Sequence, residues 1–247
     1  MKKNFEDRKY TLVVGSNGRL GKTICNHLLK NDKFVFGIDK KKSILKSQNY
    51  SHKVLDVTKS KNIQNFFSKN QYRFDNLIYS VYPFNNKWGK KFEDLDYKSL
   101  SENINFQLTS QIFFFKNFFS FALKKKFKVK VILISSIQGL GAPKFDHYKG
   151  LNMTSPIEYS AIKAATINIT KYLAKYYRGH GFNINCISPG GIKDNQSPTF
   201  QKRYSNSTIN KGLLNASDIL TGIDFLLSRN SKYVNGQNII IDDGWSI

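Results

Sequence analysis

Tyr159 and Lys163 lie four residues apart in the segment EYSAIKAATINITKYL, residues 158–173. Because four residues make about one helical turn, a helix here places both side chains on the same side. A cation within about 4–6 Å of a phenol favours phenolate and lowers the tyrosine pKa from its usual value of about 10. The pair therefore indicates a proton-transfer site. The alternative is an ordinary amphipathic helix, since this spacing arises by chance in many lysine-rich chains.

Apolar segments alternate along the chain between strand-like and helix-like patterns. Short apolar strands separated by helices are typical of a parallel sheet covered on both faces. The chain has neither a Pro- or Ser-rich linker nor an internal repeat, so we expect one domain over residues 1–247. The predicted fold is an α/β Rossmann fold, a doubly wound parallel sheet of about seven strands with helices on both faces. Strands are expected at 10–15, 34–39, within 51–58, and at 75–81, 129–136, 183–191 and 237–244, and helices at 19–31, 60–70, about 97–123, 158–173 and 216–228.

The chain is strongly basic, with 39 Lys and Arg against 17 Asp and Glu and a formal net charge of +22. Such a charge attracts anions, including nucleic acids and phosphorylated metabolites. The lysines are spread along the chain, with the densest runs at 39–43 and 123–130. Dispersed lysines favour a solvated surface over a nucleic-acid site.

Two cysteines, Cys25 and Cys186, are far apart and have no metal-ligand spacing. We therefore expect no disulfide framework, no metal site and a reducing, cytoplasmic location. The first residues include no apolar core of a signal peptide. The most apolar run, 112–123, contains Lys116 and Asn117 and is shorter than the about 20 residues that span a membrane, so it predicts a buried helix.

Glycines stand directly between the first expected strand and the first expected helix, at Gly15, Gly18 and Gly21. Glycine permits a tight turn and lets a pyrophosphate approach the backbone N–H groups of the helix N-terminus. Asp39 follows Gly15 by 24 residues, at the end of the second strand. A carboxylate there binds ribose hydroxyls and repels a 2′-phosphate, which predicts NAD, although the three lysines that follow leave NADP possible. The alternative is an aspartate at a strand end with no ligand.

With these motifs the chain resembles the short-chain dehydrogenase/reductase family over nearly its full length. The motifs that carry the resemblance occur in the order of the family. They are the glycine turn and Asp39, Asp56 in LDV, Asn105 in INFQLTSQIFF, Ser136 in ILISSIQG, Tyr159 and Lys163 in YSAIK, Pro189 and Gly190 in NCISPGGI, and the final segment IIIDDGWSI.

The resemblance implies a role for each of four candidate catalytic residues. Tyr159 would be the general acid in reduction and the base in oxidation, and Lys163 would tune its pKa and hold the nicotinamide ribose. Ser136 would orient the substrate oxygen, and Asn105 would support a water that links Lys163 to solvent. Taken singly, Ser136 could instead cap a turn, and Asn105 could be a hydrogen-bonded buried amide.

The resemblance also implies a set of residues that bind the cofactor. Four positions depart from the family pattern: Tyr79 and Ser80 replace paired asparagines, Asp243 replaces a glycine, and Arg19 stands where a second glycine commonly falls. The expected cofactor-binding residues are Gly15, Asn17, Gly18, Arg19, Leu20, Gly21, Asp39, Asp56, Val57, Ser80, Val81, Tyr82, Tyr159, Lys163, Pro189, Gly190 and Ile192.

Two loops are expected to hold the substrate, at about 137–156 and 190–212. The first is long for a structureless connection, and both are basic, which suits an anionic substrate. The alternative is that these lysines are simply solvated. The two segments resemble oxidoreductases of flagellin modification and sialic-acid-like sugar biosynthesis, so an anionic sugar or nucleotide sugar is expected. The expected substrate residues are Ser136, Gln138, His147, Tyr159, Gly191 and Lys193.

The sequence thus predicts an NAD(H)-dependent oxidoreductase that transfers a hydride to or from a carbonyl or secondary alcohol. One alternative is a catalytically silent nucleotide-binding protein with the same fold, and a less favoured one is a basic nucleic-acid-binding protein. Ala161, Ala164 and Ala165 lie on early turns of the 158–173 helix, where small residues permit close helix contacts. The family commonly uses this helix for dimers, so we expect a homodimer or homotetramer, without a nucleic-acid or membrane partner.

Overall fold

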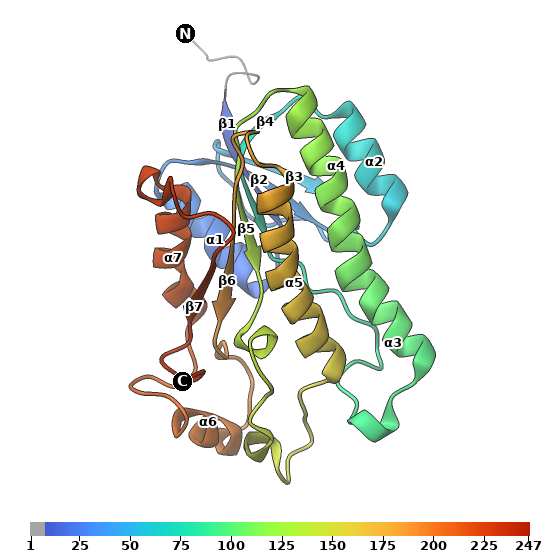
Figure 1. Ribbon diagram of the computed structural model, residues 1–247, viewed down its shortest axis with the longest axis vertical. Coiled ribbons are helices and arrows are strands. Elements are labelled where there is room, and N and C mark those ends of the chain that lie inside the picture. The colour runs from blue at the N-terminus through green and yellow to red at the C-terminus, as the bar shows by residue number, and fades with distance from the viewer. Residues whose placement is uncertain (1–7) are drawn as a thin grey trace.

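A single parallel sheet forms the centre of the computed structural model, which describes residues 8–247. Its seven strands run in the order β3-β2-β1-β4-β5-β6-β7, and every neighbouring pair is parallel (Figure 1). The prediction of a doubly wound parallel sheet of about seven strands is therefore confirmed. The strands are β1 Lys9–Val14, β2 Phe34–Asp39, β3 Tyr50–Val54, β4 Arg73–Tyr79, β5 Lys130–Ile134, β6 Asn183–Pro189 and β7 Asn238–Ile241.

Helices cover both faces of the sheet. One face packs on α1 (Arg19–Lys30) and α7 (Leu220–Leu227), and the other packs on α2 (Ser60–Lys69), α4 (Ser110–Lys124) and α5 (Ile157–Tyr176), as Figure 1 shows. Alternate residues of a strand serve the two layers, because strand side chains alternate in direction: Leu12 and Val14 face the second group of helices and Val13 the first.

The order of strands reverses at β1, which lies between β2 and β4. Connections on the two sides of this point leave in opposite directions, so a crevice opens outside the carboxyl ends of β1 and β4. The segments that follow β1, β2, β4, β5 and β6 all converge on this edge of the sheet. The predicted glycine turn, Asp39 and Ser136 are therefore brought together here.

The phenylalanine-rich segment forms α4, and five of its phenylalanines are buried against α2 and the sheet. The predicted buried helix is confirmed, and within residues 8–247 no helix has the length and apolarity needed to cross a membrane. The long helix expected at 97–123 is not regular. It consists of α3 (Tyr97–Ile104), a π-helical turn (Asn105–Thr109) and α4.

The two predicted substrate loops are more ordered than expected and pack against each other. The second contains α6 (Pro198–Ser205), which begins at the hydroxyl of Ser197 accepting the Phe200 N–H. Arg203 of α6 donates to the carbonyl of Lys149 at 2.5 Å in the first loop. A small apolar cluster between them includes Ile137, Phe200, Tyr204, Leu213 and Trp245.

Gly139 allows the turn after β5 to lie directly on α5. A Cβ atom at this position would come within 2.6 Å of the carbonyl carbon of Lys163. Ser135, at the same strand end, donates its hydroxyl to the carbonyl of Lys163 at 2.7 Å. These contacts fix the position of α5 relative to the carboxyl edge of the sheet, and they therefore fix the positions of Tyr159 and Lys163.

Candidate active site

The glycine turn after β1 shapes the floor of the crevice. Gly15 has a φ of +83°, and a Cβ there would come within 2.9 Å of the Ser80 carbonyl oxygen. The N–H groups of Gly15 and Ser16 donate to the Ile38 carbonyl at 2.8 and 3.1 Å. Gly18 precedes α1 and supplies no side chain to cap it. The first N–H groups of α1 are thus left to bind an anion at the positive end of the helix dipole.

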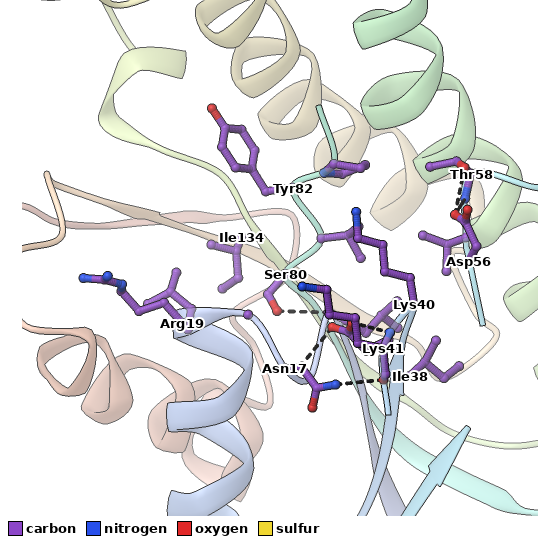
Figure 2. A pocket seen from close by; sticks show the side chains of 18 of the residues that line it. Asn17, Arg19, Ile38, Lys40, Lys41, Asp56, Thr58, Ser80, Tyr82 and Ile134 are labelled. Atoms are coloured by element: carbon purple, nitrogen blue, oxygen red, sulfur yellow. Dashed lines mark hydrogen bonds between the residues drawn. The ribbon is translucent and has the colours of Figure 1, made fainter. Parts of the chain in front are cut away.

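Asp39 connects the end of β2 to this turn. Its carboxylate accepts the backbone N–H groups of Asn17 and Lys41, each at 3.0 Å. The Asn17 amide in turn donates to the carbonyls of Lys41 and Lys42 (Figure 2). Asp39 therefore has a structural role of its own, and it also lines the crevice.

The crevice has a volume of about 470 Å³ and is lined by the carboxyl ends of β1, β2, β4 and β5 and by α5. Figure 2 shows the labelled side chains of Asp56, Thr58 and Tyr82 around it. The Asp56 carboxylate accepts from the backbone and hydroxyl of Thr58 at 2.9 and 2.7 Å. The predicted cofactor residues that line the crevice are Gly15, Asn17, Gly18, Arg19, Leu20, Asp39, Asp56, Val57, Ser80, Val81, Tyr82, Tyr159 and Lys163.

Four predicted cofactor residues are not among the residues that line this crevice. Gly21 packs on the glycine turn, where a Cβ would meet the Gly15 carbonyl oxygen at 2.0 Å. Pro189 and Gly190 are buried at the end of β6, and Ile192 forms an isolated bridge with Leu214. Conversely, strand-end neighbours that the sequence motifs did not single out do line it, namely Val14, Ile38, Leu55, Thr58, Pro83, Ile134 and Ser135.

The substitutions in the paired-asparagine position have clear structural consequences. Ser80 takes over a bond between the strands, since its backbone N–H and its hydroxyl both donate to the Val14 carbonyl at 3.0 Å. Tyr79 is buried under α4 against Phe114 and Phe115. Asp243, which replaces a glycine, adopts a φ of 55°, and its carboxylate accepts the N–H groups of three consecutive residues, 210–212. It therefore anchors the end of the second loop.

Arg19 spans the mouth of the crevice. Its guanidinium group donates to the carbonyl of Lys193 and forms an ion pair with Asp194, both in the segment after β6. The side chain of Lys193, a predicted substrate residue, is exposed, and only its carbonyl takes part in the contact with Arg19. Arg19, labelled in Figure 2, thus connects the glycine turn to the second loop.

Lys163 is buried, with 8% of its surface exposed, and its ammonium donates to the Ile134 carbonyl at 3.1 Å. The Nζ atom lies 5.5 Å from the centre of the Tyr159 ring. Burial lowers the pKa of Lys163 from 10.5 to about 8, because a charged group is disfavoured away from water. The predicted pair is therefore assembled beside the strand end of β5.

The predicted effect of Lys163 on the tyrosine is wrong for this structure. Burial raises the pKa of Tyr159 above its usual value, and a hydrogen bond with the Ser136 hydroxyl offsets part of the rise. Desolvation of the phenolate outweighs the neighbouring ammonium, which is directed at the Ile134 carbonyl. Ser136 also accepts the Gln138 N–H at 3.2 Å, so it both caps the turn and contacts Tyr159.

Asn105 does not occupy the position predicted for it. Its side chain is exposed on the π-helical turn, and it does not line the crevice. Gln107, two residues later, is 5% exposed, and its Nε2 atom has no hydrogen-bond partner among the described residues. One turn farther on, Gln111 accepts from Thr166 of α5 at 3.2 Å. The helices α4 and α5 run in the same direction (Figure 1), and the π-helical turn that carries Gln107 packs against α5.

Gln138 and His147 belong to the contacts of the first loop. Gln138 accepts from the Ser155 hydroxyl and donates to the Tyr148 hydroxyl at 3.5 Å. His147 was expected to bind substrate, but it is buried against Phe200, Tyr204 and Trp245 and contacts the Ser207 hydroxyl at 2.9 Å. Burial lowers the pKa of His147, and its ring links the two loops through Ser207.

Comparisons with known proteins agree with this geometry. A sequence profile described as enoyl-(acyl carrier protein) reductase matches residues 38–246. Post-translational flagellin modification protein A of Campylobacter coli is 34% identical, over 98% of this chain and 99% of that protein. The reductase FabG of Buchnera aphidicola, which acts on 3-oxoacyl-[acyl-carrier-protein], is 28% identical over 96% of this chain and 97% of that protein.

A solved structure shows the same arrangement of elements. A short chain dehydrogenase of Leptospira borgpetersenii, with bound NAD+, superposes with a TM-score of 0.89 at 30% identity, and the match covers all of this chain and 97% of that one. The fold, the glycine turn and the Tyr159–Lys163 pair define a dinucleotide-dependent oxidoreductase. The chain belongs to the short-chain dehydrogenase/reductase family.

Replacing Lys163 with methionine should increase stability at neutral pH while abolishing activity. The folded chain buries an ammonium with a pKa of about 8, whereas the unfolded chain has the ordinary value of 10.5. At 1.36 kcal/mol per pKa unit, the fall from 10.5 to about 8 corresponds to a gain in the free energy of unfolding of roughly 3 kcal/mol. It is greatest below pH 8, where both states are protonated, and fades towards pH 10.5, where both are neutral.

Urea unfolding of the parent and of Lys163→Met at pH 7 and pH 10 measures this difference. Lys171→Met, an exposed position on the same helix, is the matched control and should change little. Equal stability of the parent and Lys163→Met at pH 7 would contradict the argument.

Proposed function

We propose that this protein is an NAD(H)-dependent oxidoreductase that transfers a hydride to or from a carbonyl or secondary alcohol of an acidic or nucleotide-linked sugar. The observation that carries the proposal is the position of the Tyr159 ring and the Lys163 ammonium, 5.5 Å apart, in the wall of a crevice whose floor is a glycine turn and a helix N-terminus. Together they supply an anion-binding end and a proton-donating end of one site.

The residues of the crevice fit a nicotinamide dinucleotide. The uncapped N–H groups at the start of α1 suit a pyrophosphate. The carboxylates of Asp39 and Asp56 stand where a ribose and an adenine amine would need acceptors. The dinucleotide supplies the hydride when it is bound. Its use by the Leptospira relative, at 30% identity over the whole chain, supports the proposal.

Ser136 and Tyr159 would act on the substrate oxygen. The raised pKa of Tyr159 keeps the phenol protonated through neutral pH, which suits a proton donor in reduction. In the opposite direction the phenol must first lose that proton, so oxidation should accelerate as the pH rises. The hydrogen bond of Ser136 to Tyr159 places the serine hydroxyl where it can also hold a carbonyl oxygen.

Gln107 would take the role that the family resemblance assigned to Asn105. Its amide is buried on the π-helical turn that packs against α5, the helix of Lys163, and its Nε2 atom has no hydrogen-bond partner among the described residues. A buried amide donor ordinarily has a partner, and a bound water satisfies such a group. Once Lys163 has given up a proton towards Tyr159, a water held there by Gln107 would pass a proton from solvent to the neutral Lys163 amine and restore the ammonium.

The sugar is suggested by both similarity and charge. The flagellin modification protein is similar over the full length. Three cations of the two loops, Lys149, Lys193 and Lys202, have no ion pair within the described residues, whereas Arg203 and Lys144 bind carbonyls of the chain itself. The basic loops therefore contribute fewer free charges than the sequence indicated, but enough to favour an anion.

A homodimer or homotetramer is the assembly that we propose. Large apolar side chains are exposed on the outer surfaces of α4 and α5, at Ile112, Leu123, Tyr172 and Tyr176. Others are exposed beside the edge strand β7, at Phe225, Tyr233 and Ile240. Each surface is suited to a two-fold contact with a second copy, because exposed apolar groups and an open strand edge both favour association.

The preference for NADH over NADPH should depend on the charge of Asp39. The parent should bind NADH more tightly, and Asp39→Asn should increase affinity for NADPH by about tenfold, because the carboxylate no longer repels the 2′-phosphate. Fluorescence titration of both reduced cofactors measures the two dissociation constants. Asp75→Asn, at the other end of the sheet, is the control. Equal affinities of the parent for the two cofactors would refute the assignment.

Tyr159→Phe should reduce kcat by a factor of about 10² or more while the Kd for NADH stays within about twofold. Turnover is followed at the reduced-nicotinamide band with a panel of acidic, neutral and nucleotide-linked sugars. Tyr97→Phe is the matched control, because Tyr97 is 84% exposed on α3 and the variant loses only a hydroxyl. A parent that binds NADH but turns over no member of the panel would instead indicate the catalytically silent alternative.

Gln107→Leu should lower kcat by about tenfold or more without changing the KM of NADH, since it removes the donor that holds the relay water. Gln107→Asn should recover part of the rate, and Gln111→Leu, one turn away, is the control. The readout specific to the relay is the pH profile of kcat, which should change in Gln107→Leu alone. An unchanged profile would leave Gln107 with a packing role only.

A further inference from the structure

The segment that follows β4 is an aromatic loop, residues 82–91, held rigidly on α3. Asn85 is its anchor: its N–H donates to the Asn103 amide oxygen at 3.0 Å, and its own amide donates to the Glu102 carboxylate at 3.0 Å. The Ser99 hydroxyl donates back to Asn85 at 3.1 Å. The loop therefore has a fixed position relative to the start of α5.

Two aromatic rings of this loop contact Tyr159, and a third packs behind them. The Tyr82 ring lies 5.4 Å from that of Tyr159, and the Trp88 ring lies 6.4 Å from it, both edge to face. Phe84 stacks on Trp88 at 5.9 Å with an interplanar angle of 28°. The Lys163 ammonium lies 5.6 Å from the centre of the Tyr82 ring. Tyr82, Phe84 and Trp88, the aromatic wall, thus stand beside the two groups that handle the proton.

The aromatic wall is not part of the core. Tyr82 is 41% exposed and Phe84 is 54% exposed, and Trp88 is half-buried. The other tryptophan, Trp245, is 5% exposed. These rings are exposed to water beside Tyr159, and hydrogen bonds of Asn85 hold the loop that carries them. They therefore form a rigid apolar surface, on which a ligand would bind at little cost in conformational entropy. Such a surface is suited to a ligand.

Charge and polarity select among ligands. Residues 82–91 include three lysines and no carboxylate, and only Lys87 has an ion pair, with Asp96 at 3.5 Å. Lys90 and Lys91 have no ion pair within the described residues. A purely apolar substrate would gain no binding energy from these lysines. A sugar ring presents C–H groups to the electron-rich faces of aromatic rings, and its acidic group suits the lysines.

We propose that the aromatic wall is the sugar subsite: the ring of an acidic sugar lies on Phe84 and Trp88, with its reacting carbon towards Tyr159 and its carboxylate towards Lys90 and Lys91. This inference rests on the proposed function, and it assigns the sugar ring, rather than a nucleotide base, to this surface. Specificity then comes from the loop after β4 as well as from the two loops identified from sequence.

Trp88 provides a direct probe of the subsite, and its share of the fluorescence is identified with Trp88→Phe, because the other tryptophan, Trp245, is buried. The experiment uses the full-length Tyr159→Phe protein with NAD+, so that binding is measured without turnover. The ligands are N-acetylneuraminate, its methyl ester, its cytidine monophosphate conjugate, and cytidine monophosphate alone. N-acetylneuraminate and its conjugate should each produce a saturable change in fluorescence, the methyl ester should bind about tenfold more weakly, and the nucleotide alone should produce none.

Substitutions in the aromatic wall distinguish the loss of a ligand contact from the loss of the fluorescence signal. In the same background, Phe84→Ala should weaken calorimetric binding of N-acetylneuraminate by about tenfold, since a stacking face is lost. Trp88→Phe should keep most of the affinity but lose the fluorescence change. Tyr233→Ala is the control, because Tyr233 is 89% exposed and lies beside β7.

Several outcomes would overturn the assignment. They are unchanged affinity in Phe84→Ala, no saturable binding of either acidic sugar, and a full response to cytidine monophosphate alone. Different outcomes would reject the proposed reaction and the proposed subsite. If the parent, with Tyr159 intact, binds the sugar tightly but does not turn it over, hydride transfer is rejected and the subsite is kept. If the parent turns the sugar over but Phe84→Ala binds it with unaltered affinity, the subsite is rejected and hydride transfer is kept.

Discussion

The burial of one ammonium group beside a phenol is the interaction around which this molecule is arranged. Lys163 is 8% exposed, and the Ile134 carbonyl accepts a hydrogen bond from its ammonium. A charge in such a position is unfavourable unless it is hydrogen-bonded. The strand end of β5, the missing side chain of Gly139 and the hydroxyl of Ser135 all serve to hold α5 where that bond is made. Burial of the ammonium lowers the stability of the folded chain, and it places Lys163 beside Tyr159.

The departures from the family pattern are structurally accommodated. Ser80 still bonds β4 to β1, and Tyr79 contributes a ring to the core under α4. Asp243 anchors three consecutive N–H groups of the second loop, which a glycine cannot do. Arg19 connects the glycine turn to the same loop. These residues stiffen the edges of the crevice and leave the Tyr159–Lys163 pair intact.

The strongly basic composition acts in several ways. Arg203 and Lys144 fasten the loops to each other and to the C-terminal segment through backbone carbonyls, so their charge is partly used within the chain. Lys90 and Lys91 of the aromatic loop, by contrast, form no ion pair within the described residues and lie near exposed rings. An anion-attracting field next to a rigid apolar surface gives affinity and orientation together, because long-range attraction is not directional and ring contacts are.

The sequence by itself determined the sheet, the helices α1, α2, α5 and α7 in outline, a buried helix over the phenylalanine-rich segment, the glycine turn, Asp39 and the Tyr159–Lys163 pair, because apolar periodicity and short motifs are local signals. Only the tertiary structure decided the rest. The π-helical turn shifted the helical phase and buried Gln107 in place of Asn105. Packing between loops buried His147, and α6, too short for a periodic signal, formed on its cap and its contacts. Desolvation raised the Tyr159 pKa, a non-local effect that no spacing of residues encodes.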